Sequence, residues 1–406
     1  MSSRRKRILT ALDCGTPDKL PKDLGAMGST GISCFAYPAL VDALDLPPRP
    51  PRVFDTGQML AVPDRDVLDA LDCDVITVTQ DACTNAFDEP ERWRPYDFGG
   101  RLDALVMNPD AFSVEPDGTV VQKRGGSISR MPPRSHVFDT EHAGQAFDLA
   151  AEPERTDLTS LAKRLESNTP ESEAVERIVA YCRRAREATD RAIMFSGLTA
   201  GLGFPGGIPD WSILCMSDPG YVGEYHDIVT THTANMAARL APLLAPYVDV
   251  LMLSADDQGL QTGPILPPDT FGELYVPFYR RVNDAVHTSA PGLKTFLHSC
   301  GAIYELIDHV IEAGFDALNP VQWSAGGHGW LEWKDRARGK LCLWGGGVNT
   351  QSTLPLGSVS EVEEEVSAAV SDLAADGGYV FCAIHNILAE IEPEKVIAMY
   401  RTAANV

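Results

Sequence analysis

Two residues with metal-binding side chains, His298 and Cys300, stand two positions apart at the end of an apolar run over 293–297. Side chains alternate along a strand, so residues two apart point the same way. An imidazole and a thiol would therefore project together from one strand end. Nitrogen and sulfur ligands suit zinc better than magnesium or calcium. Two ligands do not make a site, so this prediction needs a third ligand from elsewhere in the chain.

The elements that must position these side chains alternate between strand and helix. Several candidate strands are apolar on both faces, as strands covered on both sides must be. This alternation predicts an α/β fold with a parallel sheet, and the number of units predicts a closed (β/α)8 TIM barrel. An open doubly wound sheet is the alternative, but no Gly-x-Gly-x-x-Gly follows the first strand. The candidate strands are 74–78, 192–195, 248–253, 293–297, 315–319, 340–344 and 379–382, and the candidate helices are 221–244, 270–289, 304–313, 360–375 and 393–404.

Two local patterns refine this expectation. Ser360 and Glu363 have the spacing of a helix-capping box. Residues 80–145 break the alternation with glycine-containing turns, which predicts a β-rich insertion near one mouth of the barrel. We therefore expect one barrel domain over 1–406 that carries this insertion.

Composition limits the classes of function. The net charge of -23 argues against binding to nucleic acid, because phosphates favour Lys and Arg. No apolar run approaches the roughly 18 residues of a membrane span, and the basic N-terminus has no apolar stretch of the kind a signal peptide carries. The 9 cysteines are scattered without a Cys-x-x-Cys pair, which fits reduced thiols. We expect a cytoplasmic protein.

Polar residues follow the predicted strands at their carboxyl ends, where the active site of a barrel gathers. The last strand offers a third zinc ligand, either Cys382 or His385. Three protein ligands and one open position are the usual arrangement of catalytic zinc. The alternative is a hydrogen-bonded histidine and a buried cysteine without metal. The polar residues at strand ends are Asp81, Asp256, Asp257, His298, Cys300, Asn319, Gln322, Cys382, His385 and Asn386.

The sequence resembles the uroporphyrinogen decarboxylase superfamily, in particular its corrinoid-dependent methyltransferase-like branch. The likeness covers nearly the whole chain and implies a (β/α)8 barrel. The decarboxylases of this superfamily bind tetrapyrrole carboxylates with an arginine-rich N-terminal motif, and the corresponding stretch 23–28 has no arginine. Matching segments are 7–12, 17–21, 29–32, 256–264, 298–301, 318–322, 377–381, 385–387 and 393–396.

The resemblance also implies roles for individual residues. The methyltransferase branch carries a His-x-Cys and a distant Cys as zinc ligands, which His298 and Cys300 match. For the third ligand we favour Cys382, because two thiolates make zinc electron-rich, with His385 as the alternative. Gln322 stands near where some relatives have a glutamate that fills the open position of zinc. Asp81 matches the catalytic aspartate of the decarboxylases by position.

We therefore predict a zinc-dependent methyltransferase that moves a methyl group between a small O-, N- or S-methylated substrate and a corrinoid (cobalamin). Asp256 or Asp257 would donate a proton or orient the leaving group, and Asn319, Gln322, His385 and Asn386 would bind substrate. No Asp-x-His-x-x-Gly corrinoid signature occurs, so the corrinoid should arrive on a partner protein. We also consider that the chain could form a homodimer. The alternatives are a metal-independent decarboxylase that uses Asp81 and a non-catalytic barrel that binds a small molecule.

Overall fold

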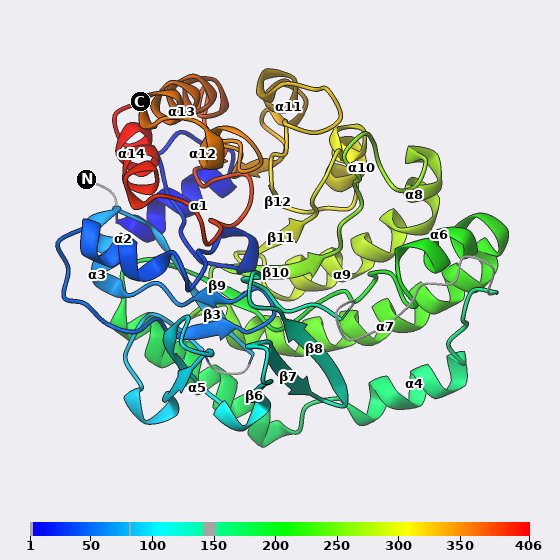
Figure 1. The fold of residues 1–406 in the computed structure, drawn as a ribbon. Helices are drawn as coiled ribbons and strands as arrows, with labels where there is room; N and C mark the ends of the chain where they lie inside the picture. The colour runs from blue at the N-terminus through cyan, green and yellow to red at the C-terminus, as the bar shows by residue number, and fades with distance from the viewer. Residues whose placement is uncertain (1–2, 81–82, 141–151) are drawn as a thin grey trace.

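The centre of the molecule is a curled sheet of parallel strands (Figure 1). The computed structural model describes residues 3–80, 83–140 and 152–406, so Asp81 lies outside the described residues. The 7-stranded sheet has the order β14-β13-β12-β11-β10-β9-β3, so consecutive strands along the barrel are neighbours in space. Each strand falls on one of the predicted apolar runs. The strands are β3 (Val75–Thr79), β9 (Ala192–Ser196), β10 (Val250–Ala255), β11 (Lys294–His298), β12 (Ala317–Asn319), β13 (Cys342–Trp344) and β14 (Tyr379–Val380).

A short extended segment at 21–23 connects the two edges of this sheet. Lys22 forms a parallel bridge with Phe381, just beyond β14. On its other side, the N–H of Asp74 donates to the carbonyl of Lys22 at 2.8 Å, next to β3. The segment therefore takes the remaining position of a (β/α)8 barrel and closes it, which confirms the predicted TIM barrel.

Helices cover the outside of the sheet. The predicted helix over 270–289 is two helices, α8 and α9, which meet at Tyr275 just before Pro277. The capping box predicted at Ser360 and Glu363 is wrong. Ser358 and Glu361, two residues earlier, form it instead. The helices are α1 (Arg4–Leu12), α2 (Tyr37–Ala43), α3 (Arg65–Ala70), α4 (Leu158–Ser167), α5 (Ser172–Ala188), α6 (Ile208–Ser217), α7 (Pro219–Leu244), α8 (Pro268–Leu274), α9 (Val276–Ser289), α10 (Ile307–Glu312), α11 (Trp330–Ala337), α12 (Thr353–Leu356), α13 (Val359–Leu373) and α14 (Pro393–Ala403).

The β-rich insertion lies between β3 and β9, as expected from the sequence. It contains a hairpin of β4 (Arg94–Asp97) and β5 (Asp103–Val106), and a 3-stranded antiparallel sheet of β6 (Phe112–Val114), β7 (Val120–Arg124) and β8 (Ser127–Met131). Aromatic rings of both parts pack together, with Phe98 and Phe112 centred 5.3 Å apart. The insertion also contacts the hairpin of β1 (Val53–Asp55) and β2 (Leu60–Ala61), because the N–H of Leu105 donates to the carbonyl of Pro51 at 2.8 Å.

Side chains inside the barrel form an apolar core of their own. It includes Met194 of β9, Phe296 of β11 and Trp344 of β13, with the rings of the last two 5.2 Å apart and edge to face. Cys382 also belongs to this core and is 1% exposed. Within the described residues, no helix is long and apolar enough to cross a membrane.

Candidate functional site

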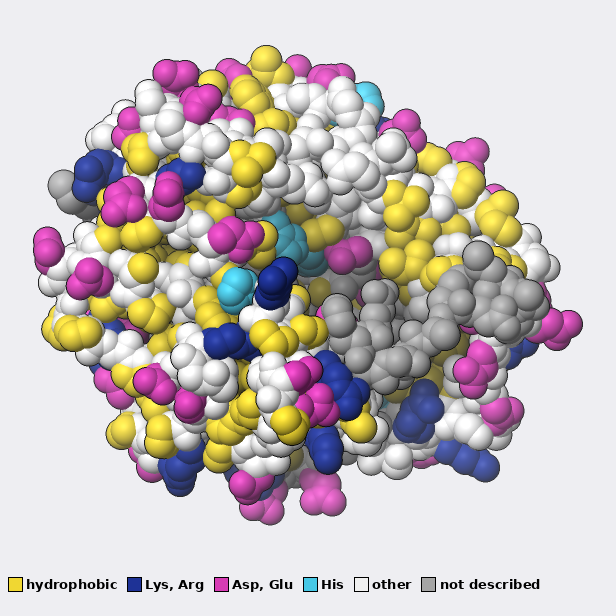
Figure 2. Space-filling view, in the orientation of Figure 1, with side chains coloured by type: hydrophobic (Ala, Val, Ile, Leu, Met, Phe, Trp, Pro, Cys, Tyr) yellow, Lys and Arg dark blue, Asp and Glu magenta, His cyan; other side chains and the backbone are white. Residues whose placement is uncertain are grey.

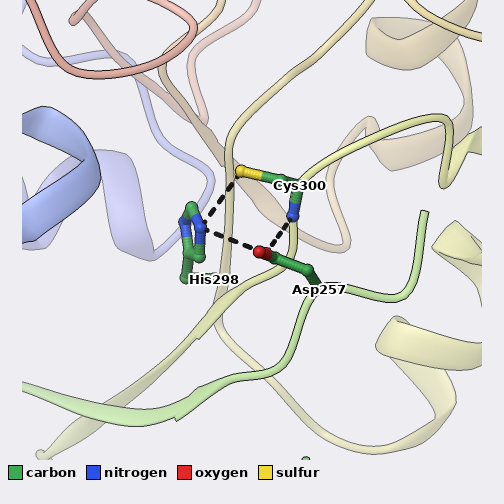
Figure 3. A group of neighbouring side chains, drawn as sticks. All are labelled: Asp257, His298 and Cys300. Carbon is green, nitrogen blue, oxygen red and sulfur yellow. Dashed lines mark hydrogen bonds and ion pairs between the residues drawn. The ribbon is translucent and has the colours of Figure 1, made fainter. Parts of the chain in front are cut away.

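His298, Cys300 and Asp257 converge at the carboxyl end of the barrel strands (Figure 3). His298 is the last residue of β11, and its Nε2 lies 3.2 Å from Sγ of Cys300. The same Nε2 lies 3.4 Å from Oδ1 of Asp257, which follows β10. The ligand atoms of the three residues all lie within 4.8 Å of one another. The structure thus brings the predicted His-x-Cys pair together with a carboxylate.

Close packing of the loops after β10 and β11 sets this arrangement. The N–H of Gly259 donates to the carbonyl of Cys300 at 3.1 Å, and the N–H of Cys300 donates to Oδ1 of Asp257 at 2.8 Å. Gly301 has a φ of 90° and packs against the backbone of Gly259. A Cβ on residue 301 would lie 2.3 Å from the carbonyl of Gly259. Glycine is needed at 301 both for its conformation and for the space. The two loops therefore hold Asp257 against Cys300.

A buried amide orients the imidazole of His298. β11 and β12 pair so that His298 stands opposite Asn319. Oδ1 of Asn319 lies 2.7 Å from Nδ1 of His298, while Nδ2 of Asn319 donates to the carbonyl of Trp344 at 2.9 Å. The bond to Trp344 directs the amide oxygen toward the ring, so Nδ1 of His298 carries a proton and Nε2 faces Asp257 and Cys300. Oγ of Ser29 also lies 2.8 Å from Nδ1.

His385 is held in the same way on the other side of Cys300. Nδ1 of His385 lies 3.0 Å from Oδ1 of Asn386, and Nδ2 of Asn386 donates to Oε1 of Gln58 at 2.7 Å. The ring of His385 lies 6.4 Å from that of His298 and interacts with the thiol of Cys300. Two imidazoles therefore flank one sulfur, and an amide oxygen faces Nδ1 of each.

The site favours a thiolate at Cys300. Burial opposes ionisation, but the interactions with His298 and His385 outweigh it and hold the pKa of Cys300 below its ordinary value. Burial also disfavours a charged imidazole, yet the bonds to Asp257 and Cys300 raise the pKa of His298 to about 10. The pKa of Asp257 is lowered, because the hydrogen bond from His298 outweighs the effect of burial. The Asp257 carboxylate and the Cys300 sulfur thus both face Nε2 of His298.

Cys382 lies outside this group of ligand atoms. Its thiol is buried in the barrel core, where burial raises its pKa well above the ordinary range. Its Sγ is 4.0 Å from Nδ2 of Asn319, on the side of the amide that faces away from His298. The structure therefore places His385, and not Cys382, beside the thiol of Cys300.

The other residues predicted from strand ends have distinct positions. Asp256 is buried and accepts hydrogen bonds from Ser254, from Tyr279 at 2.7 Å and from the N–H of Gly203 at 2.9 Å. These bonds fix the glycine-rich loop after β9. Oε1 of Gln322 accepts from the N–H of Gly301 at 2.7 Å and so supports the loop that carries Cys300.

A cavity opens beside the candidate metal ligands. Its volume is about 410 Å³, within the range of small-molecule sites. Figure 2 shows histidine side chains at the surface near the middle of this face. The residues that line the cavity are Asp257, Gly259, Leu260, Gln261, Cys300, Gly301, Gln322, Thr350, Gln351, Ile384, His385, Asn386 and Leu388.

The donor set fits zinc. In a tetrahedral zinc site, neighbouring nitrogen and sulfur ligands are about 3.5 Å apart, and nitrogen and oxygen ligands about 3.4 Å. The corresponding distances from Nε2 of His298 are 3.2 Å to Cys300 and 3.4 Å to Asp257. A zinc-binding histidine usually donates its other N–H to an oxygen, as His298 can do to Asn319. Asp257, His298 and Cys300 could hold the ion, with His385 next to Cys300.

Two of these supporting residues have weak or no signals in the sequence. Ser29 belongs to the segment 29–32 that carries part of the family resemblance, but nothing there indicates a contact with His298. Gln58 lies between β1 and β2, far from any strand end of the barrel. Only the fold brings these residues to the site.

The fold and the site define an α/β barrel with a cluster of candidate metal ligands at the carboxyl ends of its strands. The family model for uroporphyrinogen decarboxylase (URO-D) matches residues 160–406, which is more than half of the chain. The protein therefore belongs to the uroporphyrinogen decarboxylase family. No curated protein matches the sequence.

A solved structure has a similar fold over its whole length, and two others superpose less well. A methyltransferase from Methanosarcina mazei is 14% identical and superposes with a TM-score of 0.55, over 100% of this chain and 99% of that chain. A glycoside hydrolase (GH5_18) from Streptomyces cattleya, solved with GlcNAc, is 16% identical with a TM-score of 0.35, over 61% of this chain and 74% of that chain. An endo-1,4-beta-mannanase from Rhizomucor miehei is 9% identical with a TM-score of 0.35, over 70% of this chain and 98% of that chain.

Proposed function

We propose that this protein is a zinc-dependent methyltransferase that moves a methyl group between a small methylated substrate and a corrinoid. The observation that carries the proposal is the cluster of Asp257, His298 and Cys300, whose ligand atoms lie within 4.8 Å of one another beside a cavity of about 410 Å³. The full-length similarity of the fold to a methyltransferase supports the same class of reaction. The free cysteines of the chain fit a cytoplasmic location.

We assign the zinc ligands as Asp257, His298 and Cys300, with His385 as the residue best placed to add a further nitrogen. Zinc bound there would act as a Lewis acid that lowers the pKa of a substrate thiol or polarises the oxygen or nitrogen of a methylated substrate. Asn319 and Asn386 would orient the two imidazoles through their Nδ1 atoms. This assignment replaces Cys382 with Asp257 and His385.

The remaining residues position the substrate. Gln322 fixes the loop of Gly301 through its oxygen and directs its amide nitrogen away from that bond. Asp257 is the ligand most open to solvent, with 52% of its side chain exposed, so it borders the place where a substrate would enter. The corrinoid would be presented over this face by a partner protein, since the chain lacks the Asp-x-His-x-x-Gly signature.

Metal analysis and methyl-transfer assays test the proposal. Protein purified without chelator should contain one zinc per chain, and His298→Ala and Cys300→Ala should lose both zinc and methyl transfer. Transfer would be followed by the absorbance change of reduced cobalamin during a screen of O-, N- and S-methyl donors. A protein without zinc whose two variants keep full activity would contradict the mechanism. Release of carbon dioxide that survives both substitutions would instead support the decarboxylase alternative.

A further inference from the structure

The cavity beside the ligand cluster carries little charge. Among the described residues that line it, none is Lys or Arg, and Asp257 is the only one with a carboxylate. Four carboxamides line it instead: Gln261, Gln322, Gln351 and Asn386. A site that selects anions usually offers a guanidinium or an ammonium group, because these pair with carboxylate and phosphate oxygens.

Bound zinc would not give the site a net positive charge. Asp257 and the thiolate of Cys300 each contribute one negative charge, which together offset the charge of the dication. His298 and His385 would bind as neutral imidazoles. The loaded site would therefore have no net positive charge with which to attract an anion.

The carboxamides still offer free hydrogen-bonding groups to a ligand. Oε1 of Gln322 is used by the N–H of Gly301, and among the described residues its Nε2 has no hydrogen-bond partner. Nε2 of Gln351 donates to Oε1 of Gln261 at 3.4 Å. This bond leaves Nε2 of Gln261 and Oε1 of Gln351 as a donor and an acceptor at the cavity. Leu260 and Leu388, which are 53% and 40% exposed, add apolar surface at the same opening.

From this lining we infer that the cavity selects uncharged polar substrates, such as neutral methyl ethers, thioethers or amides, and discriminates against carboxylates, sulfonates and phosphates. The inference rests on the proposed function for the identity of the site, and it adds the chemical class of the substrate. An anion in the cavity would exchange its hydration for amide dipoles next to the Asp257 carboxylate, and no Lys or Arg among the described lining residues would compensate.

Binding of matched probes tests the inference without requiring turnover. One pair is 4-hydroxy-3-methoxybenzamide and 4-hydroxy-3-methoxybenzoate, and a smaller pair is 3-(methylthio)propanamide and 3-(methylthio)propanoate. Members of a pair have nearly the same shape and differ in charge. Calorimetry on zinc-loaded protein should show that an amide binds. Its carboxylate partner should bind at least about tenfold more weakly. Equal or tighter binding of the carboxylate, or no binding of either amide, would overturn the inference.

A charge variant provides the internal control. Gln351 is exposed and lies at the opening of the cavity, so Gln351→Arg should recover most of the lost affinity for the carboxylate, whereas Gln351→Glu should not. If an amide binds but no methyl group reaches the corrinoid, the proposed function fails while the charge selectivity stands. If methyl transfer occurs but carboxylates are the preferred substrates, the charge selectivity fails and the proposed function stands.

Discussion

Replacing Asn319 with alanine should weaken zinc binding without unfolding the barrel. The side chain is fully buried and makes two hydrogen bonds, one to Nδ1 of His298 at 2.7 Å and one to the carbonyl of Trp344 at 2.9 Å. Loss of an orienting partner of a metal-bound histidine typically costs about 10- to 100-fold in metal affinity. That range corresponds to about 1.4–2.7 kcal/mol, which agrees with the cost of leaving one buried polar group unpaired. Ser29 can still accept from Nδ1, so we expect the lower half of the range.

The assay is competition for zinc between the protein and a chromophoric chelator. Asn319→Asp keeps the acceptor at Nδ1 and should bind zinc more tightly than Asn319→Ala. Asn283→Ala is the matched control, because Asn283 is also fully buried and its Nδ2 donates to the carbonyls of Tyr279 and Ala313, away from the ligand cluster. If Asn319→Ala and Asn283→Ala lose stability alike and both keep wild-type zinc affinity, Asn319 does not orient the ligand and the reasoning fails.

Three further predictions address other parts of the structure. Cys382→Ala should keep zinc within a few-fold of the wild-type affinity in the same competition assay, whereas Cys300→Ser should lose it, and the reverse order would restore Cys382 as a ligand. Gly301→Ala should lower both the thermal midpoint and the zinc content, because its Cβ would lie 2.3 Å from the carbonyl of Gly259. Burial lowers the pKa of His226 to about 4, so only the unfolded chain gains a proton between about pH 6.5 and 4. The free energy of unfolding should therefore fall by up to about 3 kcal/mol as pH drops through this window, and chemical denaturation of His226→Phe should lack that part of the slope.

The barrel could be predicted because its strands are buried on both faces and read as separate apolar runs. The closing segment could not, because residues 21–23 form a single bridge with Phe381 and include a proline, which has no N–H to donate. Nothing in the composition of such a short segment distinguishes it from a loop. The capping box moved from Ser360 to Ser358 because both positions have a glutamate three residues later, so spacing alone did not separate them.

The candidate site, too, could be predicted only where regular strand periodicity applies. His298 and Cys300 meet because strand periodicity places residues two apart on one side, and the structure has them at 3.2 Å. Periodicity ends with the strand, however, and β14 ends at Val380. Beyond that residue the loop geometry determines where side chains point, so the sequence left Cys382 and His385 as alternatives. The orienting contact of Asn319 also could not be predicted, because it depends on the register of β11 and β12, which sets Asn319 opposite His298.

The choice of amides around the histidines links the ligand cluster to the selectivity of the cavity. Carboxylates at the positions of Asn319 and Asn386 would orient the imidazoles equally well, but they would add two negative charges to Asp257 and Cys300. A site with that charge would bind zinc more tightly and make it a weaker Lewis acid, because each added anion offsets part of the charge of the dication. Neutral orienting groups would keep the ligand geometry and leave a bound zinc ion electrophilic. The two added carboxylates of an Asn319→Asp, Asn386→Asp double variant should therefore strengthen zinc binding and further weaken the binding of anionic probes in the adjoining cavity.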